Sequence, residues 1–157
     1  MALLDMTRDD DRHIAQRLSA EPIIWLCTVR PDGRPHNVPV WFAWQDPTIL
    51  IFSDPGTAKV RDIQRSAAVS LALDSADGGR DVVLAEGRAK LITHAGEHPH
   101  FLAGQFRHKY SQSLGTASFE GWRSTFSQPV LIHVERIIAW TRTAAGLEYR
   151  SVPKAVS

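Results

Sequence analysis

The segment 53–61 (SDPGTAKVR) combines a turn, a hydroxyl and two cations where a short helix is expected to begin. Unpaired N–H groups and the positive end of a helix dipole make such a helix start an anion site. Thr57 adds a hydroxyl donor there, and Lys59 and Arg61 add positive charge. The pattern fits a bound phosphate group, and it equally fits a capped surface helix with solvated cations.

A second stretch, residues 37–44 (NVPVWFAW), places a proline and two tryptophans in an apolar strand. Pro39 has no N–H for a β-ladder, so we expect one side of the strand to be free, with backbone groups able to meet a planar ligand. Trp41 would supply a wall on which such a ligand stacks. The alternative is that Trp41 and Trp44 fill the core or a subunit interface.

Other chemically versatile residues form no comparable pattern. His94, His98 and His100 have a spacing that metal ligands can use, but a glycine and a proline interrupt the segment, so we expect solvated histidines and no metal site. Cys27 lies in an apolar stretch without a nearby cysteine and is expected to be a buried, inert thiol. Serine-hydrolase, P-loop and dinucleotide-binding motifs are missing, which argues against those three classes.

Length and composition indicate a single domain over residues 1–157, with residues 1–7 and 144–157 as terminal tails. Apolar residues make up 43% of the chain and charged residues 22%, which is enough for one hydrophobic core. The formal net charge of +1 provides no overall field for nucleic-acid binding, so no nucleic-acid partner is expected. The start of the chain is too polar for a secretory signal, and no apolar run is long enough for a membrane span; both predict a cytoplasmic protein.

The candidate residues have to be positioned by a mainly β chain. Apolar spacing and turn chemistry predict helices over 8–20, 58–65, 97–110 and 119–126, and strands over 23–30, 35–44, 48–53, 67–74, 81–93 and 129–143. Gly87 is expected to form a β-bulge in the fifth strand. Because strands and helices do not alternate regularly, the pattern predicts a six-stranded antiparallel β-barrel with peripheral helices at its mouth.

Three segments in order carry a resemblance to a known family: TVRPDGRPHNVPVWF (28–42), ILIFSDPGTAKVRDIQRSAAVSLALD (49–74) and VVLAEGRAKLI (82–92). Together they resemble the pyridoxamine 5'-phosphate oxidase-like split-barrel superfamily over about residues 10–140. They look most like its branch of flavin- and deazaflavin (F420)-dependent oxidoreductases, which is common in actinobacteria. The resemblance implies a split β-barrel of the FMN-binding type, an obligate homodimer, and two cofactor sites in grooves between the protomers.

The resemblance also implies a cofactor site. Its residues would be Val38, Pro39, Val40 and Trp41 along the tricyclic ring, Phe52 and Ser53 in the same groove, and Thr57, Ala58, Lys59 and Arg61 at the phosphate-binding turn. In the FMN oxidases the ring strand carries an arginine and a lysine in an R-x-x-L-L-K type run. Residues 39–44 have neither, which favours coenzyme F420 as the cofactor over FMN.

The function implied is that of an oxidoreductase that transfers hydride from reduced F420 to a small apolar unsaturated or carbonyl substrate. No side chain is assigned as a catalytic acid or base, because the cofactor carries the chemistry. The alternatives are an FMN-dependent oxidase or reductase similar to pyridoxamine phosphate oxidase, a non-catalytic carrier of flavin or haem, and a protein-interaction module. His108, Lys109 and Tyr110 could border the substrate opening, or simply end an amphipathic helix.

Overall fold

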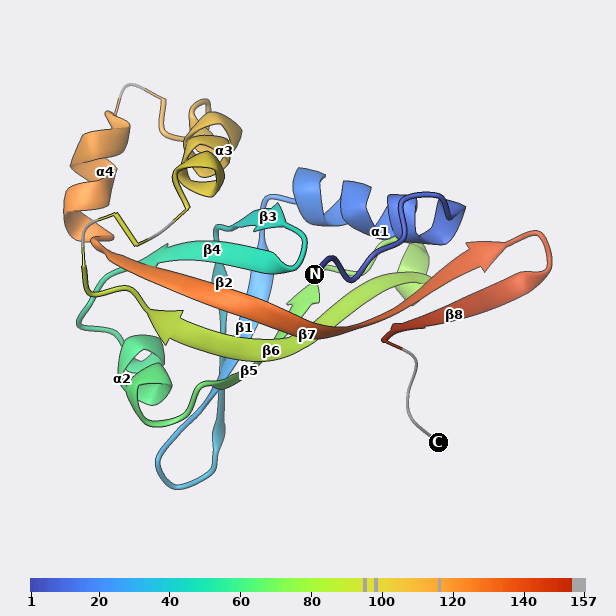
Figure 1. Cartoon of the computed structure of the whole chain (residues 1–157), viewed down its shortest axis with the longest axis horizontal. Coiled ribbons are helices and arrows are strands. Elements are labelled where there is room, and N and C mark those ends of the chain that lie inside the picture. Colours follow the sequence, from blue (N-terminus) through green and yellow to red (C-terminus); the bar gives the residue numbers. More distant parts are fainter. Residues whose placement is uncertain (95, 98, 116, 154–157) are drawn as a thin grey trace.

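Apolar, β-branched segments separated by tight turns form an antiparallel sheet in the computed structural model (Figure 1), which describes residues 1–94, 96–97, 99–115 and 117–153. The elements in chain order are α1 (Asp9–Ala20), β1 (Ile24–Val29), β2 (Pro35–Val40), β3 (Ala43–Gln45), β4 (Thr48–Ser53), α2 (Ala58–Arg65), β5 (Ala68–Leu73), the 3-10 turn η1 (Asp77–Gly79), β6 (Asp81–Leu91), α3 (His100–Tyr110), α4 (Phe119–Thr125), β7 (Gln128–Thr143) and β8 (Gly146–Val152). No helix in these ranges is long and apolar enough to cross a membrane. His98 lies outside the described residues.

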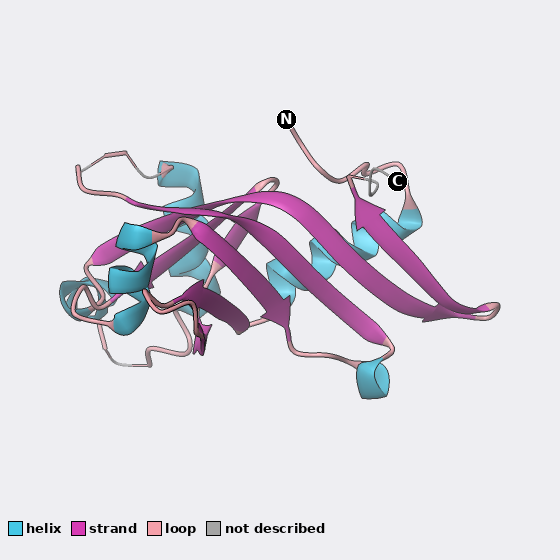
Figure 2. Ribbon diagram, turned by 90° about the horizontal axis from the view of Figure 1, so that it is seen from below, coloured by secondary structure: helices cyan, strands magenta, loops and turns pink. Residues whose placement is uncertain are grey.

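The strand order explains why the barrel is split. The described strands form one sheet in the order β2-β1-β5-β6-β7-β4-β3, with β8 paired to β7. β2 and β3 stand at opposite ends of this order, yet only Trp41 and Phe42 separate them along the chain. The sheet must therefore curl until its two ends approach, and the described pairings include no ladder between them. Figure 2 shows the curled sheet with helices around it, which confirms the predicted mainly β split barrel.

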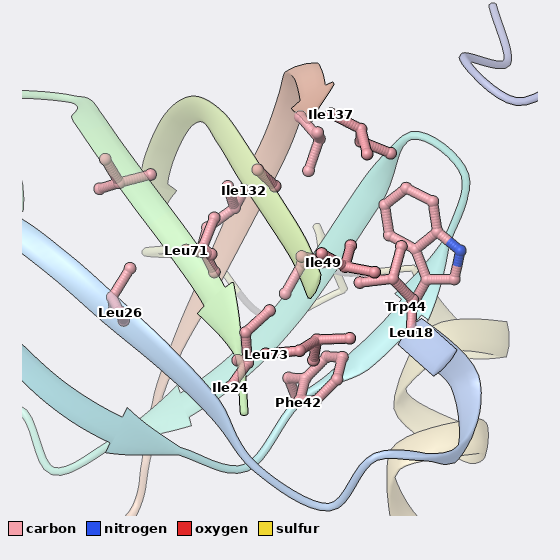
Figure 3. Packing of buried hydrophobic residues seen from close by; sticks show 14 of the residues in the cluster. Leu18, Ile24, Leu26, Phe42, Trp44, Ile49, Leu71, Leu73, Ile132 and Ile137 are labelled. Atoms are coloured by element: carbon pink, nitrogen blue, oxygen red, sulfur yellow. The ribbon is translucent and has the colours of Figure 1, made fainter. Parts of the chain in front are cut away.

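Side chains that alternate along the strands fill the interior of the curl, as the pleat of a β-strand requires. Figure 3 shows part of this core, with Phe42, Trp44 and Ile49 close to Leu18 of α1. Ile14 and Leu18 are four residues apart on one face of α1, and both are buried. The helix thus contributes an apolar face to the barrel core, and Trp44 is a core residue.

Gly87 forms the bulge that the sequence predicts. The register between β6 and β7 shifts between Glu86 and Gly87. A Cβ atom at Gly87 would lie 2.2 Å from the backbone carbonyl oxygen of His133. Only glycine allows this close approach of two backbones, so the bulge depends on its missing side chain.

Several boundaries differ from the predictions. The strand expected over 35–44 breaks at Trp41–Phe42, and this break divides it into β2 and β3. The expected tail after Ala144 is wrong as well, because Gly146–Val152 forms β8, which pairs with β7 from Ile137 to Thr143. With the break and this extra strand, the described sheet has eight strands where six were predicted.

Residues near the start of the chain and the described residues of β8 are also attached to the domain. Near the start, the backbone N–H groups of Leu3 and Leu4 donate to the Asp46 carboxylate, and the Leu4 side chain is buried. Near the end, Arg150 of β8 donates two hydrogen bonds, of 2.6 and 2.8 Å, to the buried carboxylate of Asp11 in α1. The prediction of terminal tails did not include these hydrogen bonds, because polar contacts of this kind leave no apolar pattern in the sequence.

Candidate functional site

A pocket of about 310 Å³ lies where the end of β2, β4, α2 and α4 come together. Its lining residues are Ile23, Pro39, Val40, Trp41, Phe52, Lys59, Trp122 and Phe126. Pro39, Val40 and Trp41 come from the predicted ring strand, and Lys59 comes from the predicted phosphate turn. The fold therefore brings the two stretches singled out in the sequence to one cavity.

Hydroxyl groups and a cation gather where α2 begins. The Lys59 Nζ donates to the Thr57 Oγ1 at 3.3 Å, and the Thr57 and Ser53 hydroxyls lie 3.1 Å apart. The turn itself is shaped by Asp54, whose Oδ1 accepts a hydrogen bond from the Gly56 N–H at 2.7 Å. Thr57 makes no side-chain cap on the helix, so the first N–H groups of α2 are not satisfied in that way. Burial lowers the pKa of Lys59, and the charge of Asp54 partly opposes this shift.

Four other predicted cofactor residues do not line the pocket: Val38, Ser53, Ala58 and Arg61. Arg61 is exposed and donates to the Gly56 carbonyl at 2.7 Å, so it braces the turn and does not line the pocket. Val38 is partly buried against the barrel core, and Ser53 is buried beneath the turn. Ala58 is half-buried in the first turn of α2 and does not line the pocket.

Two residues at the end of α3 hold the break between β2 and β3. The Phe42 N–H donates to the Tyr110 hydroxyl at 2.9 Å. The Phe42 carbonyl accepts from the Lys109 Nζ at 3.1 Å and lies 3.0 Å from the Tyr110 hydroxyl. The break removes these backbone groups from the ladder, and α3 supplies their partners.

Burial at this contact shifts the pKa of both residues. It lowers the pKa of Lys109 to about 8 and raises the pKa of Tyr110 to about 12. Neither residue lines the pocket, although both were considered for its opening. His108 borders a different depression, together with Lys109 and Trp44. The end of α3 therefore acts on the pocket indirectly, by fixing the backbone next to Trp41.

Trp41 belongs to an aromatic stack and is not the bare wall that the sequence suggested. Its ring stacks on Tyr110 at a centroid distance of 4.4 Å and on Trp122 at 5.4 Å. Trp122 also stacks on Phe126 at 4.6 Å. A ligand in the pocket would thus contact aromatic rings of the α3–α4 segment as well as the ring strand.

Three lining residues, Ile23, Trp122 and Phe126, were not predicted from the sequence. A signal for the last two exists in the segment 119–126, where Phe119, Trp122 and Phe126 recur at helical spacing. Such an apolar face on a short helix is expected to pack against another apolar surface of the protein. Which surface it covers depends on tertiary contacts, so the sequence alone does not connect it with β2.

The lining combines one cation with an otherwise apolar surface. Of the lining residues in the described part of the chain, Lys59 is the only one with an ionisable side chain, and none is a carboxylate. The arrangement can hold an anionic group at the start of α2 and a flat apolar group against the aromatic surface that Trp41, Phe52 and Trp122 form. It offers no acid–base pair for catalysis.

Solved structures share this fold. A conserved hypothetical protein from Mycobacterium tuberculosis is 24% identical, with a TM-score of 0.66 and 93% of each chain covered. A FAD-binding protein from Mesorhizobium loti is 21% identical, with a TM-score of 0.63 over 88% of this chain and 93% of the other. The haem storage protein HutZ from Vibrio cholerae is 13% identical, with a TM-score of 0.63 over 86% and 92%.

A search of curated proteins finds no match. The model of one protein family, described as pyridoxamine 5'-phosphate oxidase, matches residues 11–141. This range contains every residue that lines the pocket and every strand of the barrel except β8 and the last two residues of β7. The chain therefore belongs to the pyridoxamine 5'-phosphate oxidase family of split-barrel proteins.

Proposed function

We propose that the protein is a homodimeric oxidoreductase that binds F420 and transfers hydride to a small, largely apolar unsaturated or carbonyl substrate. FMN is the alternative cofactor. The observation that carries the proposal is the single pocket in which Pro39, Val40 and Trp41 meet Lys59. A cofactor with a flat ring system and a phosphate-bearing tail needs both of these surfaces within reach of each other.

The residues fit such a cofactor. Within the described ranges, Lys59 forms no ion pair, so its charge is available to a phosphate group. The uncapped start of α2 adds N–H donors at the same place, on a turn that the Ser53 and Thr57 hydroxyls hold by donating to the Asp54 carbonyl. The cavity volume of about 310 Å³ lies at the lower end of the range for ligand pockets, so it suits a ring system whose tail continues along the α2 turn.

Bound F420 or FMN would supply the hydride chemistry, and the chain's own residues would bind, orient and shield it. Lys59 and Thr57 would hold the phosphate, and Val40 and Trp41 would set the plane of the ring. Trp122 and Phe126 would exclude water from the reacting face. The ring strand contributes no cation to the lining, and this supports F420 over FMN.

A carrier of haem is the second class that the fold allows, since HutZ shares it. Among the described residues, the lining of this pocket contains no histidine, cysteine or methionine that could ligate a haem iron. The lining of the pocket therefore favours a flavin-type ligand over haem.

The homodimer is supported by an uncovered face of the sheet. A depression of about 400 Å³ runs across β2, β1, β5, β6 and β7 and is lined mostly by small and apolar side chains, Trp25 and Cys27 among them, together with the polar Asn37 and the charged Glu86. Cys27 is half-buried there and not fully buried as expected. Trp25 pairs with Pro39 across β1 and β2, so a second copy on this face would reach the edge of the pocket. Light scattering on a dilution series tests the homodimer. We expect the mass of a dimer, and a stable monomer would contradict the proposal.

Parallel titration of the purified protein with F420 and with FMN tests the cofactor. We expect saturable binding of F420, with weaker binding of FMN, and hydride transfer from reduced F420 to at least one member of a panel of enones and quinones. Tight binding of FMN without binding of F420 would show that FMN, and not F420, is the cofactor. Firm binding without turnover on any acceptor would favour a carrier.

A further inference from the structure

Two arginines of the α3–α4 segment lie against aromatic rings, but they differ in their charge partners. Arg107 of α3 lies 5.5 Å from the centre of the Phe119 ring and forms an ion pair with Glu120 at 3.0 Å. Arg123 of α4 lies closer to its ring, 3.9 Å from the centre of Phe52. Among the described residues Arg123 has no acidic partner, and the hydrogen bond it donates goes to the backbone carbonyl of Phe126.

Arg123 is placed at the edge of the pocket. Phe52, on which its guanidinium lies, lines the cavity, and so do its neighbours Trp122 and Phe126. The side chain is half-buried, and burial lowers its pKa. Removing a cation from water without an opposite charge costs free energy. A negatively charged ligand group at this point would offset the cost.

From this position we infer that Arg123 is an anion anchor for the substrate, and that the substrate is a flat aromatic molecule that carries a carboxylate. The guanidinium matches a carboxylate because it can donate two parallel hydrogen bonds. The Phe52 ring beneath the guanidinium and the Trp122 ring beside it suit a flat aromatic body, and Trp41 is left to the cofactor ring. One positive charge at Arg123 balances one negative charge on the ligand.

This inference rests on the proposed function in that the substrate shares the cavity with the cofactor. It assigns the two cations different tasks. Lys59 sits at the start of α2 among hydroxyls and serves the cofactor tail, whereas Arg123 belongs to α4 and lies over the Phe52 ring. The carboxylate restricts the proposed substrates to a smaller class. Such a molecule has the flat, largely apolar body of the proposed substrate and carries one negative charge.

Calorimetric titration with 2-naphthoate and its uncharged analogue 2-naphthamide tests the assignment. We expect the wild-type protein to bind naphthoate at least tenfold more tightly than naphthamide. Arg123→Gln should lower the affinity for naphthoate to that for naphthamide, and Arg123→Lys should retain it within a few-fold. Arg107→Gln is the matched control, and its affinity should equal that of the wild type because Arg107 is already paired with Glu120.

The inference is overturned if naphthoate does not bind, if it binds no better than naphthamide, or if Arg123→Gln binds it like the wild type. It is also overturned if Arg123→Gln weakens F420 or FMN binding as much as Lys59→Gln does, because the anchored anion would then belong to the cofactor. A thermal melt shows whether Arg123→Gln folds, and the ratio of naphthoate to naphthamide affinity in the wild type carries the test if it does not. Failure of both cofactors to bind, with naphthoate still dependent on Arg123, would reject the proposed function and leave this inference standing.

Discussion

The change Tyr110→Phe tests how α3 holds the strand break beside the pocket. Phenylalanine keeps the aromatic ring that stacks on Trp41 and removes only the hydroxyl. That hydroxyl accepts a hydrogen bond from the Phe42 N–H and lies 2.8 Å from the Pro22 carbonyl oxygen. Without it, the Phe42 N–H has no described partner in a residue that is 0% exposed.

The expected cost follows from this unpaired donor. A buried polar group left without a partner costs about 1–3 kcal/mol, and no apolar volume is lost that would add a cavity term. We therefore expect the free energy of unfolding to fall by about 2 kcal/mol. For a chain of this length this corresponds to a lowering of Tm by about 4–8 °C at fixed protein concentration.

Urea denaturation at fixed protein concentration measures the effect, and the other tyrosine of the chain is the control. Tyr149 is 73% exposed on β8, and the described contacts give its hydroxyl no hydrogen bond. Tyr149→Phe should change the free energy of unfolding by less than about 0.5 kcal/mol. Equal effects of the two substitutions would refute the view that Tyr110 satisfies the broken strand.

Three further changes probe other parts of the fold by urea denaturation. Arg150→Gln leaves the buried Asp11 carboxylate unpaired and should cost about 3 kcal/mol; a loss below 1 kcal/mol would mean that β8 is not anchored to α1. Gly87→Ala should cost about 2–3 kcal/mol because its Cβ meets the His133 carbonyl, and a neutral result would contradict the bulge. The pKa of Lys109 is lower in the folded chain, about 8 against 10.5, so the wild type should gain on the order of 1 kcal/mol relative to Lys109→Met as pH rises from 8 to 10. A pH-independent difference between the two proteins would show that Lys109 is not buried.

The parts of the fold that the sequence predicts are those specified locally. The turn at residues 31–34, with Gly33 at a φ of +85°, and the alternating strands around it are encoded within a few residues. The bulge at Gly87 is marked by a glycine inside an apolar strand. These features need no knowledge of distant contacts.

The missed parts depend on contacts between residues far apart in the chain. β8 is mostly exposed and lacks an apolar alternation, so only its ladder with β7 identifies it as a strand. The break at Trp41–Phe42 is stable because Tyr110 satisfies the backbone from 68 positions away. Trp122 lines the pocket and Arg123 lies over Phe52 only because α4 packs against Phe52, a contact that their local sequence does not encode.

The proposed function depends on Lys59 binding the phosphate-bearing tail of a planar cofactor held in the pocket. Comparing the cofactor affinities of Lys59→Gln and Arg61→Gln tests it most directly, since both cations lie on α2 and only Lys59 lines the cavity. We predict that Lys59→Gln weakens F420 binding by about 1.5–3 kcal/mol, or about 10- to 150-fold, and that Arg61→Gln changes it less than about threefold. Equal affinities of Lys59→Gln and the wild type, or a larger loss from Arg61→Gln, would contradict the account.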